Sequence, residues 1–212
     1  GKEDKAEAEF RAVVVANPKD VNAKIEVVRF LASVQGSKAA TTELQALLSA
    51  DPGNTELLFA LAGLHQAEGD REAADDVLRK IMAKAGDTQD GLRAKGLLAG
   101  SLLAGKDKTG AKALVKDILA KDARNEQALI LRAEMEIEEG QIEDAIADLR
   151  TILRDAPSSS RVLLLLGKAH EFAGARDLAD DSYSRAFRAS KLAGPYGVTY
   201  ADFLIKVGKA KQ

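Results

Sequence analysis

The sequence predicts an all-α protein in which pairs of antiparallel helices are stacked as a solenoid. Three observations predict this fold class: the composition, the spacing of seven glycines, and a recurring pattern of small and large apolar residues. Alanine, leucine, lysine, glutamate and aspartate dominate the 212 residues, aromatic residues make up only 4%, and tryptophan is absent. This composition favours helices, because unbranched side chains lose little rotamer freedom there.

Glycines that end one helical pattern just before another begins recur at intervals of 33 to 36 residues. They are Gly1, Gly36, Gly69, Gly105, Gly140, Gly174 and Gly208. A helix commonly ends with one residue in the left-handed conformation, which glycine adopts without steric cost. Asp70 follows Gly69 directly and is placed to cap the next helix. Each glycine is therefore predicted to form the turn of a helical hairpin.

The helix after each turn carries three apolar positions with a fixed spacing. After Gly69 they are Ala74, Leu78 and Ile81, and spacings of four and three place them on one helix face. The alanine is expected to let the two helices of a hairpin approach closely. The same positions after Gly1 hold Ala6, Phe10 and Val13. The second helices are expected to end at Pro18, Pro52, Gly86 and Pro157.

The register divides the whole chain, residues 1–212, into a single array of twelve helices. An unpaired second helix is expected over residues 1–17 and an unpaired first helix over residues 194–208. The five complete hairpins between them are expected over residues 20–51, 54–86, 88–122, 125–157 and 159–191. Natural arrays usually end in a polar capping helix, whereas the last helix here carries Val198, Leu204 and Ile205. We therefore expect the chain to be a piece of a longer array.

The hairpin pattern resembles the tetratricopeptide repeat (TPR), a unit of about 34 residues with the signature W-x2-L-G-x2-Y, then A-x3-F, then A, then P. The best match lies within residues 160–191, where the signature positions hold Leu163, Leu166, Gly167, His170, Ala179, Tyr183 and Ala186. No repeat has the tryptophan, and the turns at Gly36 and Gly105 run one residue short and one residue long. The resemblance covers all 212 residues and implies a right-handed α-α superhelix.

Composition and motifs exclude or disfavour several classes of function. The chain has no cysteine, which excludes disulfides, thiolate metal sites and cysteine nucleophiles. A formal net charge of −2 argues against a broad nucleic-acid surface, and no apolar run approaches the roughly 20 residues that cross a bilayer. The segment GKDKTGAK (105–112) partly resembles a phosphate-binding loop, but Ala111 stands where lysine is required and the segment follows a helix.

The remaining titratable groups are better explained by the repeat than by catalysis. His65 and His170 occupy the same position three repeats apart, and residues so far apart in a solenoid do not form one site. The acidic doublets at 75–76 and 180–181 also recur at one repeat position, which is typical of a solvated helix face. We therefore expect no enzyme activity, no cofactor and no metal site.

The resemblance implies that the first helix of each hairpin lines a concave side, with exposed positions 10, 6 and 3 residues before each turn. The Lys, Asn and Arg residues with which some family members clamp a C-terminal carboxylate are absent there. The positions instead predict an apolar groove with scattered charges, which suits an amphipathic helix or an extended segment. The candidate binding residues are Glu26, Phe30, Phe59, Gln66, Lys95, Leu102, Ile130, Glu134, Ile137, Leu164 and Lys168, and Gly63 lies among them. The alternative is that these residues pack against neighbouring repeats or face a further turn of the superhelix of a longer array.

Two functions of different class remain open. One is a scaffold that holds a peptide or protein segment in its groove. The other is a structural spacer of a larger protein, or a segment that self-associates through its open ends. Neither nucleic acid nor a membrane span is expected. The compartment stays open, although the array resembles those of bacterial envelope proteins that serve polysaccharide or protein export, which favours the periplasm or envelope over the cytoplasm.

Overall fold

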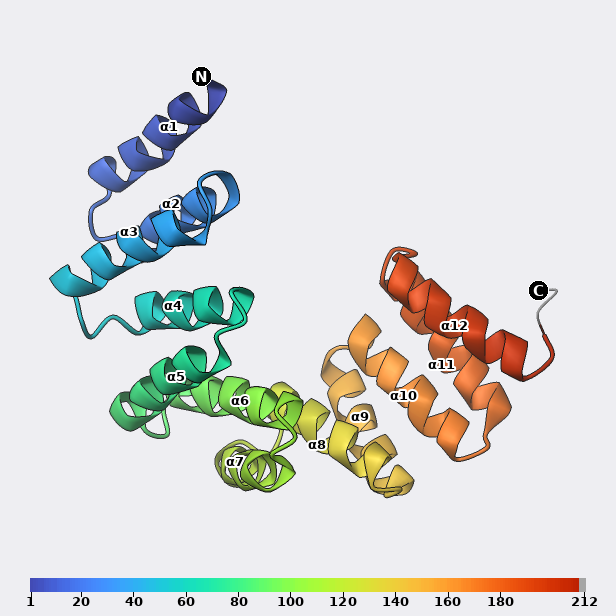
Figure 1. Cartoon of the computed structure of the whole chain (residues 1–212). Helices are drawn as coiled ribbons and strands as arrows, with labels where there is room; N and C mark the ends of the chain where they lie inside the picture. Colours follow the sequence, from blue (N-terminus) through green and yellow to red (C-terminus); the bar gives the residue numbers. More distant parts are fainter. Residues whose placement is uncertain (210–212) are drawn as a thin grey trace. The chain divides into compact units, whose positions relative to one another are not determined.

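The computed structural model describes residues 1–209, which form twelve α-helices (Figure 1). The helices are α1 (Lys2–Ala16), α2 (Val21–Val34), α3 (Ser37–Ala50), α4 (Thr55–Ala67), α5 (Arg71–Ala85), α6 (Gln89–Ala104), α7 (Lys108–Lys121), α8 (Glu126–Glu138), α9 (Ile142–Asp155), α10 (Ser160–Phe172), α11 (Arg176–Ala189) and α12 (Gly194–Lys206). The predicted all-α class and the predicted number of helices are confirmed. None of the helices within residues 1–209 is long and apolar enough to cross a membrane.

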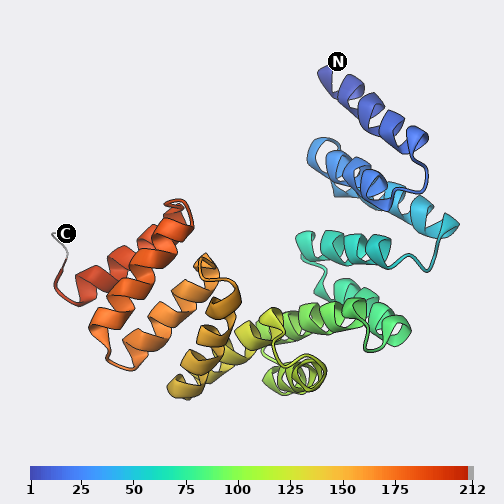
Figure 2. The same cartoon turned by 180° about the vertical axis from the view of Figure 1, so that it is seen from behind.

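The chain divides into two compact units, and the boundary falls within α6, after Ser101. In the first unit α2 packs on α3 and α4 on α5, while α1 lies against α2 and α3 against α4 (Figure 2). In the second unit α8 packs on α9 and α10 on α11, α9 lies against α10, and α12 lies against α11. Consecutive helices are thus paired within each unit, as the spacing of the turns predicts.

The core of each unit contains the apolar positions that the repeat predicts. Ala74, Leu78 and Ile81 of α5 are 5%, 4% and 1% exposed. In the second unit Ala145 and Leu149 of α9 are fully buried. An alanine thus sets the close approach of two helices, and the larger residue one turn later fills the space beside it.

Helix α1 departs from this prediction, because no residue of α1 is buried. Phe10 is 37% exposed and Val13 50% exposed, so the expectation of a packed apolar face is wrong for this helix. In α3 and α5 the equivalent face packs against the preceding helix, whereas α1 packs against the helix that follows it, α2. The apolar contacts of α1 include Val14, which packs against the core of the first unit, and Phe10, whose ring centroid lies 5.3 Å from that of Phe30.

The turns confirm the predicted role of glycine with one exception. Gly69 has a φ of +81°, and Asp70 then caps α5 by accepting a hydrogen bond from the Ala73 N–H at 3.1 Å. In the long turn after α6, Lys106 rather than Gly105 has positive φ, +69°. The extra residue shifts the terminal hydrogen bonds by one position, so that the Lys106 N–H donates to the Leu103 carbonyl at 3.0 Å.

Candidate functional site

An open cavity of about 300 Å³ is lined by α2, α4 and α6, each the first helix of a hairpin, within the first unit. Its wall is mainly apolar and carries three charged residues. The lining residues are Ile25, Val28, Arg29 and Ala32 of α2, Glu56, Phe59, Ala60, Gly63, Leu64 and Ala67 of α4, and Arg93 of α6. Spacings of three and four residues bring these positions to one face of α2 and one face of α4. The cavity therefore lies on the helices that the sequence assigns to the binding side.

Two capping residues fix the starts of α2 and α4, the helices that supply most of the cavity wall. Asp20 accepts a hydrogen bond from the Ala23 N–H, and Asn54 accepts one from the Leu57 N–H, both at 3.2 Å. Such caps satisfy a backbone donor at the helix start and are worth about 1 kcal/mol each. They stabilise the first turn of each of these two helices.

Arg93 of α6 crosses to α4 and covers the aromatic ring at the cavity. Its guanidinium carbon lies 4.0 Å from the centroid of the Phe59 ring, and its Nη1 lies 3.2 Å from Glu56 Oε1. A cation over an aromatic face is worth about 0.5–1 kcal/mol at an exposed site. On the opposite rim Arg29 pairs with Glu26 of the same helix. Both arginines of the cavity thus have a carboxylate beside them.

The predicted binding residues of the first unit lie in different environments. Glu26 and Gln66 are exposed, and Phe30 is half-buried against Phe10. Phe59 is only 7% exposed because Arg93 covers its ring. Lys95 is also buried, since its ammonium turns back to donate to Asp87 at 2.9 Å in the loop before α6. The cavity wall includes Phe59 and none of the other four.

In the second unit the predicted binding residues are mostly packed or paired. Ile130 is 6% exposed and belongs to the core that α8 shares with α9 and α10, against which Ile137 also packs. Glu134 accepts a hydrogen bond from Arg161 at 3.0 Å. Packing of this kind is the alternative that the sequence leaves open for these positions. The others are Leu102 and Leu164, which are half-buried, and Lys168, which is exposed.

Several residues that line the cavity were not predicted from the sequence. Arg29 directly precedes the predicted Phe30, and Ala60 directly follows the predicted Phe59. Arg93 has no signal of its own in the repeat pattern, because its role depends on the approach of α6 to α4. Gly63 did carry a signal, because an isolated glycine inside a helix costs about 1 kcal/mol relative to alanine.

The histidines and the acidic doublets form no shared site. His170 is buried, and burial, together with Arg150, holds the pKa of its imidazole below the usual value. Asp75 is buried as well, and its Oδ1 has no hydrogen-bond partner, so the expectation of a solvated face is wrong for this residue. Its position next to Ala74 on the packed side of α5 explains the burial. In the part of the chain that the structure describes, no group of three or more His, Cys, Asp or Glu residues is arranged to hold a metal ion.

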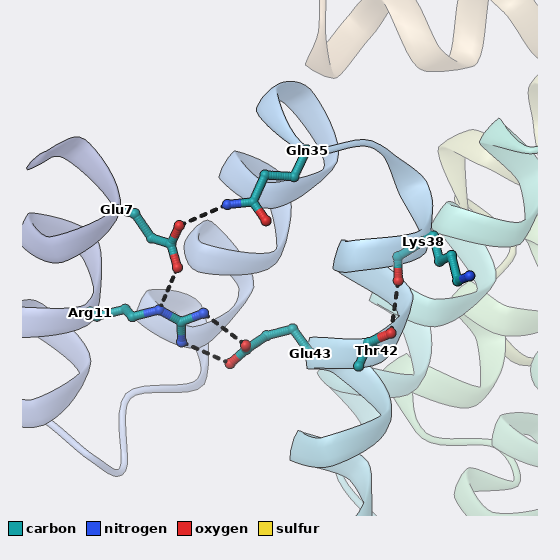
Figure 3. A network of polar contacts seen from close by, with 6 residues as sticks. All are labelled: Glu7, Arg11, Gln35, Lys38, Thr42 and Glu43. Carbon is teal, nitrogen blue, oxygen red and sulfur yellow. Dashed lines mark hydrogen bonds and ion pairs between the residues drawn. The ribbon is translucent and has the colours of Figure 1, made fainter. Parts of the chain in front are cut away.

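A polar network holds α1 to the first hairpin of the unit (Figure 3). Arg11 pairs with Glu7 of its own helix at 2.8 Å and with Glu43 of α3 at 3.0 Å. Gln35, directly after α2, donates to the other oxygen of Glu7 at 2.8 Å. Hydrogen bonds to Glu43 and then to Glu7 raise the pKa of the Arg11 guanidinium. These contacts connect α1 to its neighbours although the helix buries none of its own side chains.

A second polar cluster in the second unit contains a carboxylate that binds a proton near neutral pH. Arg132 of α8 forms two hydrogen bonds with Asp148 of α9, at 2.6 and 2.7 Å. Glu136 lies one turn after Arg132, and its Oε2 is buried without a hydrogen-bond partner. Burial first, and then the nearby charges of Asp148, Asp144 and Glu139, raise the pKa of Glu136 to about 7, while Arg132 opposes the shift. The folded protein therefore binds this proton more tightly than the unfolded chain does.

This cluster predicts a pH dependence of stability that the substitution Glu136→Gln removes. Because the folded-state pKa is raised, the stabilising contribution is complete below about pH 4.5 and is lost as the pH rises through about 7. We expect the unfolding free energy of the parent to fall by about 1 kcal/mol between pH 5 and pH 8 relative to the variant. This value is smaller than the full pKa shift of Glu136 would give, because solvent screens part of the interaction. Urea titrations followed by circular dichroism at four pH values measure it. Parallel pH profiles for parent and variant would contradict the prediction.

Comparison with family models and with curated proteins gives no match. Among solved structures, the chain is similar to a thermophilic TPR protein of Thermus thermophilus, with a TM-score of 0.69 and 19% identity over 87% of this chain and 98% of that one. It is also similar to PilW, a widely conserved type IV pilus biogenesis factor, with a TM-score of 0.73 and 18% identity over 90% and 87% of the two chains. A chain of an APC/C hetero-tetramer matches with a TM-score of 0.81 and 14% identity over 99% of this chain and 42% of that one. The chain therefore has the fold of tetratricopeptide-repeat proteins.

Proposed function

We propose that the chain is a non-catalytic scaffold that holds a segment of a partner protein on the face formed by α2, α4 and α6. The observation that carries this proposal is the cavity of about 300 Å³ between these helices. The cavity has a mainly apolar wall and charged residues at its rim. It is lined by α2, α4 and α6, each the first helix of a hairpin. Concave sites of this size with a few polar groups at the rim are typical of ligand sites in proteins.

The chemistry of the wall favours binding over catalysis. The three charged groups of the cavity are two arginines and one glutamate, and each arginine is already paired with a carboxylate. Neither of the two histidines lines this cavity. Such a surface supplies apolar contact area and a few hydrogen bonds at its edge, which is how grooves on helical repeats recognise peptide segments.

The substitution Gly63→Trp tests the proposal because it fills the cavity. A Cβ at position 63 meets no atom within 4 Å, so a large side chain enters the cavity without displacing the core. We expect peptides selected from a displayed library of random decapeptides to bind the parent and to bind the variant at least tenfold more weakly. Fluorescence anisotropy with labelled copies of the selected peptides measures the affinities.

The control places the same side chain elsewhere in the first unit. Ala46 is exposed on α3 and does not line the cavity, so Ala46→Trp should leave peptide binding unchanged. The proposal is wrong if the library yields no peptide, or if the selected peptides bind the Gly63→Trp variant as tightly as the parent. The first of these results would favour the second candidate, a structural spacer. That candidate is supported by exposed apolar side chains on α1 and α12, namely Phe10, Val13, Val15, Val198 and Ile205.

A further inference from the structure

Gly63 lies inside α4 at a position where nothing within the protein calls for glycine. Its φ is not in the left-handed region, and a Cβ built on it would meet no atom within 4 Å. Glycine inside a helix lowers stability relative to alanine, because it loses more conformational freedom on folding. Neither backbone conformation nor packing therefore explains the residue.

Two other glycines inside helices, Gly167 and Gly197, have a visible structural reason. A Cβ on Gly167 would lie 2.6 Å from Cδ1 of Tyr183, and one on Gly197 would lie 2.9 Å from the ring of Phe187. At these positions a side chain of the protein occupies the space that the missing Cβ leaves. At Gly63 the corresponding space belongs to the cavity between α2, α4 and α6. A glycine is the usual residue where a ligand must approach a backbone closely.

The charges around the cavity indicate what kind of ligand fits. Arg93 pairs with Glu56, and Arg29 pairs with Glu26, so the positive and negative charges of the rim cancel. A ligand with a net charge would have to compete with one member of each pair. A peptide main chain instead carries N–H donors and C=O acceptors without net charge. Guanidinium groups donate and carboxylates accept, so the rim complements a main chain.

The apolar wall indicates the side chain that accompanies this main chain. Ile25, Val28 and Leu64 contribute aliphatic surface to the cavity. Phe59 contributes a ring, but Arg93 already covers one face of it. A branched aliphatic side chain finds apolar contact here, whereas an aromatic ring could stack on Phe59 only from the side that Arg93 does not cover.

We propose that an extended, locally uncharged peptide crosses α4 with its main chain against Gly63 and places one aliphatic side chain in the cavity. This inference rests on the proposed function and specifies the ligand of the same site. In this arrangement the affinity comes from main-chain contacts and from one anchor side chain, as in other modes of recognising an extended peptide.

The test uses a peptide probe of defined chemistry. The probe is a capped decapeptide of serine and glycine with one central leucine, titrated into the ¹⁵N-labelled chain and followed by the amide signals of Gly63, Ala60 and Leu64. We expect saturable shifts of these signals. Probes in which aspartate or lysine replaces the leucine should bind at least tenfold more weakly.

The substitution Gly63→Ala tests whether the peptide main chain approaches Gly63 closely or whether only a peptide side chain occupies the cavity. One methyl group leaves most of the cavity open, and alanine should raise the thermal midpoint because it favours the helix. We expect the leucine probe to bind this variant at least fivefold more weakly than the parent. The Ala46→Trp variant should bind the probe as the parent does.

The possible results distinguish this inference from the proposed function. If library peptides bind Gly63→Trp more weakly but bind Gly63→Ala like the parent, the proposed binding function is supported. The close approach of the main chain to Gly63 is then refuted. If only peptides with charged anchors bind the parent, the uncharged aliphatic ligand is refuted while the scaffold remains. If neither the probe nor any library peptide binds, both proposals fail.

Discussion

Replacing Tyr183 by alanine is expected to lower the free energy of unfolding of the second unit by about 3–5 kcal/mol. Removal of a large buried aromatic side chain costs this much, because the apolar contacts are lost and a cavity remains. The Tyr183 side chain is 1% exposed, and its ring lies 5.1 Å from that of Phe203, centroid to centroid. It also fills the space beside Gly167, where a Cβ would lie 2.6 Å from its Cδ1.

The variant Tyr183→Phe is the matched control for this prediction. The phenol donates a hydrogen bond to Glu171 Oε2 at 2.8 Å, and burial followed by this carboxylate raises the pKa of the phenol, so the donor stays protonated. Phenylalanine keeps the ring and loses only this bond, at a cost of about 1 kcal/mol. Urea unfolding followed by circular dichroism measures both variants. A loss below about 1 kcal/mol for Tyr183→Ala would show that the ring does not support the core.

The second large effect is expected for Gly91→Ala, in the first turn of α6. A Cβ on Gly91 would lie 1.9 Å from the carbonyl oxygen of Gly86. Because that atom is backbone, the loop before α6 must move as a whole, and overpacking of this kind costs about 1–3 kcal/mol. We expect a loss near the upper end of this range, about 3 kcal/mol, since a carbonyl oxygen cannot rotate aside as a side chain does.

Gly63→Ala is the control for this second prediction. Both substitutions add one methyl group to a helix and gain the same intrinsic preference for helix, about 1 kcal/mol. At Gly63 nothing opposes the gain, because the space around the new Cβ is open. Thermal and urea unfolding should therefore rank the proteins as Gly63→Ala, parent and Gly91→Ala, from most to least stable. A Gly91→Ala variant as stable as the parent would contradict the predicted backbone clash.

Local features of the sequence were sufficient to predict the helices and turns. Gly69 and Gly140 have positive φ where the spacing places a helix end, because the left-handed conformation depends on the residue itself. The caps follow the same logic, as Asp70 accepts from an N–H only three residues away. The exception at Lys106 arose because an insertion of one residue moves the hydrogen-bonded turn relative to its glycine.

The candidate site was only partly predictable from the sequence. Gly63 and Phe59, which the sequence places on one face of a helix, both line the cavity, since a helix repeats its faces every three to four residues. Whether a residue on that face is open to a ligand depends on what lies across from it. Ile130 was expected at a groove and is 6% exposed, because the neighbouring helices of its unit cover it.

By itself, the sequence determined the succession of helices, the place of the turns and, in helices such as α5 and α9, the face that packs. These properties depend on residues at most a few positions apart, and they repeat along the chain. Only the tertiary structure decided that Arg93 covers Phe59 and meets Glu56, 37 residues earlier. It also decided that the space beside Gly63 stays open. Such contacts depend on the distance and rotation between packed helices, which are set by many side chains at once and leave no short pattern in the sequence.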